Sequence, residues 1–228
     1  MFRTTDTFLN IFSQVLVFLP LIPVVLILWK RFYRIDSLNF LMILCLVEFI
    51  EQLSLHIDAF PTEAAPGISN LFLLLESVIY FLLFRSHFGG MAREVLLYFA
   101  IAFFSSLITY YIVAGINQEG LSMHLIQFAL IACMVSYCMA GLIKRDNPRI
   151  LQFPIFWIGA GTLFYILILA ITVITEKFLH KEYGRHGAGQ GIQKMIIVDM
   201  ADLARYAFYI IAVWVRNMSE RSESKHED

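Results

Sequence analysis

Hydrophobic residues recur along the chain in runs of about twenty, separated by short polar connectors. A helix of this length is about 30 Å long, which matches the hydrocarbon core of a bilayer. The pattern predicts an all-α membrane protein, a seven-transmembrane-helix bundle that occupies residues 1–215. The expected spans are 8–29, 38–57, 68–86, 94–115, 121–143, 153–175 and 193–215.

The segments outside these spans are short and polar. Residues 216–228 are mostly polar and predict a disordered cytoplasmic tail. The Gly-rich residues 183–191 lack the Gly-Lys-Ser/Thr ending of a phosphate-binding loop and predict a flexible external connector. Within the first span, Pro20 and Pro23 remove two backbone donors, and we expect a bend in that helix.

The composition supports membrane insertion. Of the 228 residues, 59% are hydrophobic and 15% are charged, whereas soluble domains have about 25% charged residues. The formal net charge of −1 provides no basic stripe for nucleic-acid phosphates, so nucleic acid is excluded as a main partner and the lipid bilayer is the expected one. Cys45, Cys133 and Cys138 lie in apolar runs, as small buried hydrophobic residues do.

Lysine and arginine are distributed unevenly between alternate connectors. Connectors rich in these residues stay in the cytoplasm. The asymmetry therefore predicts an external N-terminus and a cytoplasmic C-terminus, in a multi-pass protein of a bacterial inner (plasma) membrane. The richer set comprises Lys30, Arg31, Arg34, Arg85, Arg93, Lys144, Arg145, Arg149, Arg216, Arg221 and Lys225.

Polar side chains inside the spans are the candidates for function, because each is costly in hydrocarbon and usually faces the bundle interior or a water-filled cavity. On several helices these side chains share one face. We expect a polar cavity in the outer half of the bundle that binds a small ligand or a cation. Its predicted residues are Glu48, Glu51, Gln52, Asn70, Glu76, Thr109, Tyr110, Gln127, Asp199, Asp202, Arg205 and Tyr206.

This set contains five acids and one obligate cation, Arg205. Burial and mutual repulsion favour the protonated form of some of the acids. Otherwise a metal, a proton relay or a positively charged ligand compensates their charge. Asp202 and Arg205, three residues apart, are also able to neutralise each other as an internal pair.

Two stretches resemble small seven-helix membrane proteins of Bacteroidota. Residues 69–80 contain an Asn-Leu-aromatic-x-Leu-x-Glu run, and residues 147–159 lead into a span that opens with Pro-x-Phe-Trp-Ile. Some members of this group are similar to the membrane-embedded sensor parts of histidine kinases. The resemblance implies a sensory or signalling module. Since we identify no kinase domain in the chain, it also implies a signalling partner such as a histidine kinase.

Two further functions stay open on the residues alone. One is an intramembrane hydrolase of a lipid or amide that uses zinc as cofactor. Its metal ligands would be His56, His124 and Asp199, and Glu51 or Asp202 would be its catalytic proton-transfer residue.

The other is a proton- or cation-coupled transporter. A relay of Glu48, Glu76 and Asp202 would carry the proton or cation through the bundle. The hydrolase predicts bound zinc, and the transporter predicts pH-driven flux in liposomes.

Overall fold

The structure is a computed structural model that describes residues 12, 14–56, 65–85, 87–88, 90–115, 121–143, 150–183 and 188–224. For helical residues 55–56, 65, 92, 114, 121–124, 176–183, 188–195 and 218–224 only the backbone is described. In these ranges the chain is all-helical, with seven α-helices and two 3₁₀ turns. It forms two compact units, which we name the α2–α6 unit (Pro20–Asn147) and the α7–α8 unit (Met1–Leu19 with Pro148–Asp228).

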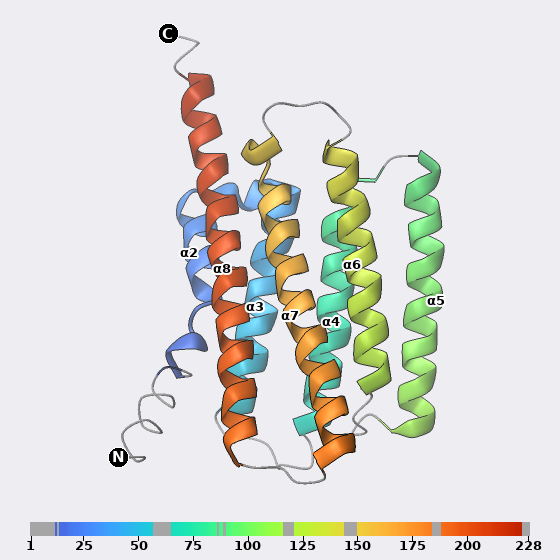
Figure 1. Cartoon of the computed structure of the whole chain (residues 1–228). Coiled ribbons are helices and arrows are strands. Elements are labelled where there is room, and N and C mark those ends of the chain that lie inside the picture. The colour runs from blue at the N-terminus through green and yellow to red at the C-terminus, as the bar shows by residue number, and fades with distance from the viewer. Residues whose placement is uncertain are drawn as a thin grey trace. The chain divides into compact units, whose positions relative to one another are not determined.

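The α2–α6 unit is built around α3 and α4, which pack against each other. The turn η1 and helix α2 lie against α3, while α5 and α6 each contact α4 (Figure 1). Leu38, Leu41, Cys45 and Glu48 are buried and follow helical spacing, so α3 turns one face inward. The bounds are α2 Leu21–Trp29, η1 Phe32–Arg34, α3 Asp36–His56, α4 Ala65–Arg85, α5 Gly90–Ala114 and α6 Leu121–Ile143.

The α7–α8 unit contains the turn η2 (Ile150–Gln152) and two long helices, α7 (Pro154–Tyr183) and α8 (Ala188–Ser224). The helices are antiparallel neighbours, since Thr162 contacts Tyr209 whereas Tyr165, further along α7, contacts Arg205, which lies earlier in α8. At about 1.5 Å per residue, this register places residues 195–216 of α8 beside Pro154–Thr175 of α7.

Five of the described helices are long and apolar enough to cross a membrane. They correspond to the predicted spans 38–57, 68–86, 94–115, 121–143 and 153–175, which confirms a multi-pass helical membrane protein. Helix α8 is not one of these five helices, because Asp199, Asp202 and Arg205 interrupt its apolar stretch. The five apolar segments are Asp36–Ser54, Pro66–Arg85, Arg93–Val113, Leu125–Ile143 and Pro154–Thr175.

The described part of the first predicted span is a broken helix rather than a bent one. Its backbone turns at residues 17–20, where Phe18 N–H donates to the Val15 carbonyl. Helix α2 then starts after Pro20, and Pro23 falls in its first turn, where a backbone N–H has no acceptor within the helix. The proline pair therefore ends one helix and starts another. Residues 8–11 and 13 of this prediction lie outside the described residues.

The last two helices extend beyond their predicted limits. Helix α7 runs on to Tyr183, and α8 begins at Ala188, inside the predicted connector. Helix α8 also continues to Ser224, so the prediction of disorder from residue 216 is wrong up to that point. Elongating an existing helix needs no new nucleus, and each added residue closes one hydrogen bond. Residues 184–187 and 225–228 lie outside the described residues.

Helices α7 and α8 approach each other closely at a glycine. A Cβ on Gly161 would lie 2.7 Å from Phe208 Cβ and 3.2 Å from the Arg205 carbonyl oxygen. The Phe208 ring also lies near Trp157 and Phe164 of α7, with ring centroids 6.0 and 6.4 Å away. The absence of a side chain at Gly161 thus lets Phe208 fit against α7, which sets the spacing and register of the two helices.

We expect Gly161→Ala to lower the free energy of unfolding by about 1–3 kcal/mol, because the new methyl group must push the helices apart. Gly141→Ala is the matched control, since a Cβ there meets no atom within 4 Å. Denaturant unfolding of both variants in detergent measures the difference. Equal stability of the two variants would contradict the proposed close contact.

Candidate functional site

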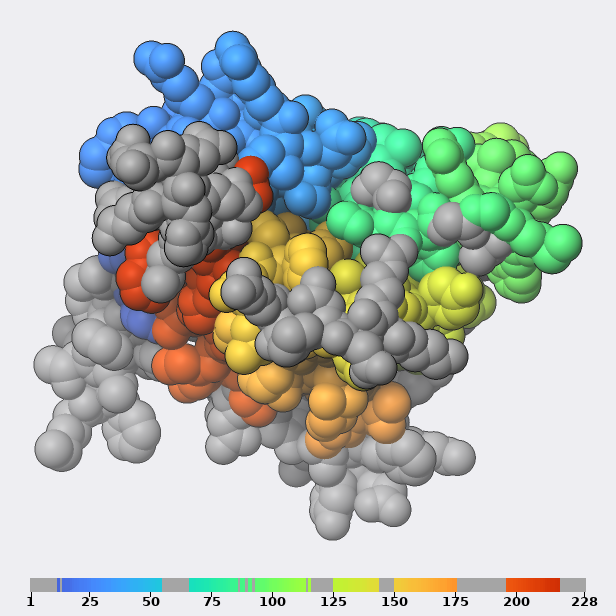
Figure 2. All heavy atoms as spheres, turned by 90° about the horizontal axis from the view of Figure 1, so that it is seen from above, coloured from blue at the N-terminus to red at the C-terminus, as the bar shows by residue number. Residues whose placement is uncertain are grey.

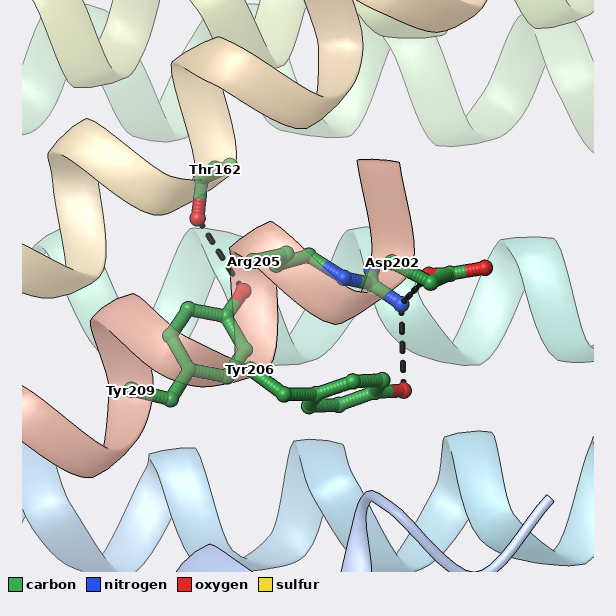
Figure 3. A network of polar contacts seen from close by, with 5 residues as sticks. All are labelled: Thr162, Asp202, Arg205, Tyr206 and Tyr209. Carbon is green, nitrogen blue, oxygen red and sulfur yellow. Dashed lines mark hydrogen bonds and ion pairs between the residues drawn. The ribbon is translucent and has the colours of Figure 1, made fainter. Parts of the chain in front are cut away.

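A buried arginine is the centre of the α7–α8 unit. Arg205 is 3% exposed. Its Nη2 donates to Asp202 Oδ1 over 2.7 Å and to the Tyr206 hydroxyl over 3.1 Å (Figure 3). A charged donor and a charged acceptor make this the strong kind of hydrogen bond. The sequence-based expectation that Asp202 and Arg205 pair is confirmed.

Aromatic rings complete the surroundings of this guanidinium. Its Cζ lies 3.8 Å from the ring centroid of Tyr165 on α7 and 4.9 Å from that of Tyr206. Arginine keeps its proton in proteins, so burial does not remove the charge. Asp202 and the two ring faces therefore stabilise a permanent positive charge, and cation–π attraction is stronger where water is excluded.

The pair lies level with the middle of an apolar helix segment. Tyr165 is close to the centre of Pro154–Thr175, the part of α7 that is long enough to cross a membrane. Because the guanidinium contacts Tyr165, it lies at that depth. Asp202 lies one helical turn away from Arg205, on the side nearer the Thr175 end of the α7 segment.

A second hydrogen bond between the two helices adjoins the ion pair. The hydroxyls of Thr162 and Tyr209 lie 3.2 Å apart, and both residues are buried (Figure 3). Thr162 also donates to the Ile158 carbonyl, so the Tyr209 hydroxyl is the donor between them. Sequence analysis missed Thr162, Tyr165 and Tyr209. The available signal was helical spacing. Thr162 and Tyr165 lie one turn apart on α7, and Tyr209 lies one turn after Tyr206 on α8.

In the α2–α6 unit, a buried amide connects α6 to α4. Gln127 Nε2 donates to the Leu73 carbonyl over 3.0 Å and to Ser77 Oγ. Ser77 in turn donates to the same Leu73 carbonyl over 2.8 Å. Gln127 and Ser77 are both buried. These contacts are the kind that join helices in a membrane, where the alternative partner for a polar group is hydrocarbon.

The polar face predicted on α3 meets the start of α4. Ser69 Oγ donates to Glu51 Oε1 over 3.2 Å. Glu48 and Asn70 are buried, whereas Gln52 and Glu76 are half-buried. Glu48, Glu51 and Glu76 thus lie in or beside the protein interior.

The polar residues of α5 are arranged differently. Thr109 is exposed and donates to the Ser105 carbonyl of its own helix over 2.8 Å. Tyr110 is half-buried, and its ring meets that of Tyr111 edge to face, with centroids 5.7 Å apart. The Thr109 hydroxyl is therefore bonded within its helix, and the structure does not place it beside the acids of α3 and α4.

The predicted cavity residues fall on both units. The α7–α8 unit brings Asp202, Arg205 and Tyr206 together, and Asp199 is half-buried one turn before Asp202. Convergence of both sets on one cavity stays a prediction. The other eight predicted residues, on the α2–α6 unit, are Glu48, Glu51, Gln52, Asn70, Glu76, Thr109, Tyr110 and Gln127.

The predicted zinc site lies largely outside the described side chains. The backbones of His56 and His124 are helical, but their side chains are not among those described. Among the described side chains, no group of three His, Cys, Asp or Glu residues is arranged to hold a metal ion. The zinc site with Asp199, and the catalytic roles of Glu51 and Asp202, stay predictions.

No protein-family model, curated protein or solved structure matches this chain. The resemblance to seven-helix proteins of Bacteroidota thus stays a prediction. What the fold and the site define is a class: a multi-pass helical membrane protein with a buried Asp202–Arg205 ion pair in its α7–α8 unit.

Removing the negative charge of the pair should destabilise the protein more than removing the positive charge. We expect Asp202→Asn to cost about 3–5 kcal/mol, because it leaves a buried arginine without its counterion. Arg205→Gln should cost less, since Asp202 is able to take up a proton and become neutral. Denaturant unfolding measures both, with the exposed Glu94→Gln as control.

The double variant completes this thermodynamic cycle. Its loss should be smaller than the sum of the single losses, because neither charge is then left alone. Additive losses would show that the two side chains do not interact.

Two serine variants test the connection between α4 and α6. Ser77→Ala and Ser106→Ala each remove a hydroxyl that donates to the carbonyl four residues earlier, but only Ser77 also bonds to Gln127. We expect Ser77→Ala to cost about 0.6–1.7 kcal/mol, the range for hydrogen bonds between membrane helices, and Ser106→Ala to cost less. Unfolding in detergent compares them, and equal losses would refute the connection.

Proposed function

We propose that this protein is a sensory or signalling module of the membrane, in which a small ligand or cation acts on the acidic polar residues and α8 carries the response to a partner. One observation carries the proposal. A single uninterrupted helix bears the buried Asp202–Arg205 pair and continues to Ser224. Any movement of the pair is therefore transmitted along one helix rather than across a loop.

The dimensions of α8 support this role. Its 37 residues give a length of about 55 Å, nearly twice the hydrocarbon thickness of about 30 Å. In the register with α7, residues 217–224 extend past Pro154, the start of the apolar segment of α7. That end of α8 carries the charged residues Glu220, Arg221 and Glu223. A polar helical end of this kind suits docking to a protein.

The pair itself provides the two states that a signal requires. Asp202 Oδ1 accepts from Arg205, while the second carboxylate oxygen points away from the guanidinium (Figure 3). A proton or small cation that binds this oxygen weakens the attraction to Arg205. The equilibrium between two positions of α8 then shifts, and the size of the shift is set by how much more tightly the proton or cation binds in one position than in the other. Asp199 and Asp202 lie one turn apart on α8, and two carboxylates so close together favour a positively charged ligand.

The proposed topology has seven spans, with the segment around α2 and helix α8 added to the five apolar ones. Residues 195–216 of α8 run beside the membrane-crossing part of α7, which supports α8 as the seventh span. The excess of Lys and Arg in alternate connectors supports a cytoplasmic C-terminus. We place the protein in a bacterial inner membrane with a histidine kinase as partner, following its resemblance to the Bacteroidota group.

Spin labels at the exposed Leu151 of η2 and at Asn217 of α8 test this relay, with the three native cysteines replaced. We expect a change from about pH 8 to about pH 5, or addition of sodium ions, to shift the distance between the labels by about 2 Å. Asp202→Asn should abolish the shift, because it removes the acid that binds the proton or cation.

Ser105→Ala is the control, since it removes one exposed hydroxyl of α5 and no charge. An unchanged distance under every condition would refute the relay. Sodium or proton flux in proteoliposomes, with a static α8, would favour the transporter instead.

A further inference from the structure

A group of basic side chains gathers at one end of the α2–α6 unit. Lys30, Arg31 and Arg34 follow one another between α2 and α3, and Arg31 and Arg34 are exposed. Asp36, the first residue of α3, is also exposed and is the acid that follows them. Figure 2 shows this end of the unit, where the blue surface of α2 and α3 adjoins the surface of α4.

Arg85 lies at the same end of this unit because of the pairing of α3 with α4. The two helices run antiparallel (Figure 1), and Ser69 bonds to Glu51. Counted from that contact, the same number of residues leads to Arg85 along α4 and back to Ile35 along α3, so Arg85 lies level with Arg34. Its guanidinium lies 6.0 Å from the Phe81 ring centroid. We name Lys30, Arg31, Arg34 and Arg85 the basic corner.

An apolar stripe leads directly to the basic corner. Ile22, Val25, Leu28 and Trp29 of α2 are 43%, 58%, 51% and 72% exposed and share one helix face. The nine residues of α2 measure about 14 Å, which is close to half of the hydrocarbon core and thus to one leaflet. Lys30 Nζ lies 5.3 Å from the Trp29 ring centroid, where the stripe meets the charges.

We propose that the basic corner and the stripe on α2 together bind one anionic phospholipid. The basic corner contacts the headgroup phosphate, and the acyl chains lie along Ile22, Val25 and Leu28. Basic groups at membrane helix ends attract anionic lipids in this way. An acidic protein would match the charges, but it would not match an exposed apolar stripe one leaflet long. The Pro20 break, which shortens α2, is what matches the stripe to a single leaflet.

Trp29 reports on the lipid beside it when Trp157 and Trp214 are replaced by Phe. The protein is reconstituted into phosphatidylcholine vesicles with a minor fraction of brominated phosphatidylglycerol, or with the same fraction of brominated phosphatidylcholine. Bromine quenches tryptophan only at short range. We expect about threefold more quenching by the anionic lipid, and high salt should reduce the difference. Equal quenching by both lipids overturns the proposal.

Charge-removing variants locate the site. Lys30→Gln, Arg31→Asn and Arg34→Gln together should abolish the preference for phosphatidylglycerol. Asparagine is chosen at position 31 because Arg31 has a φ of 58°, which asparagine tolerates. Arg34→Gln alone should halve the preference, which keeps the test available if the triple variant does not fold. Arg93→Gln, an exposed cation of α5, should leave the preference unchanged.

Three further outcomes would overturn a lipid site at the basic corner. Loss of the preference in Arg93→Gln as well would show that a diffuse positive surface attracts the lipid. Displacement of the brominated lipid by dissolved glycerol phosphate would show that the basic corner binds the phosphate without the acyl chains. Relief of quenching by an added acidic peptide, with no lipid preference, would assign the basic corner to a protein partner.

Discussion

A positive charge that cannot be given up lies at the centre of the α7–α8 unit. Arg205 keeps its proton, is 3% exposed, and lies level with the middle of an apolar helix segment. Three described neighbours compensate that charge: Asp202 by ionic attraction, Tyr165 and Tyr206 through their ring faces. The close approach of α7 and α8 at Gly161 brings Tyr165 near enough to contribute. Helix packing and charge compensation therefore depend on each other in this unit.

The two units use polar residues in different ways. In the α2–α6 unit, Gln127 and Ser77 form neutral hydrogen bonds that join α6 to α4, and such bonds change little with pH or ions. In the α7–α8 unit, the Asp202–Arg205 pair is ionic, so a charge that reached Asp202 would change its strength. We therefore propose that the first connection is structural and the second responsive. The responsive pair lies on the helix that continues to Ser224, which is why we assign the relay to α8.

The sequence predicted five of the spans because their signal is local: about twenty apolar residues form a membrane-length helix whatever lies beside them. The first span stays a prediction. A proline pair is compatible with either a bend or a break, and in the described part of this span a turn over residues 17–20 separates two helices. The end of α8 differs from its prediction. A polar sequence is typical of disorder on its own, but it extends a helix that already exists.

Sequence alone determined the membrane class and the pairing of Arg205 with Asp202, since these follow from hydropathy and from a separation of three residues on one helix. The partners on α7 were decided by tertiary structure. Tyr165 contacts Arg205, and Thr162 contacts Tyr209. Both contacts require one particular rotation and register of α7 against α8. That register depends on Phe208 packing against Gly161, a contact between residues far apart in the chain. Helical periodicity identifies the face on which a residue lies, but the neighbour of that face is set by packing.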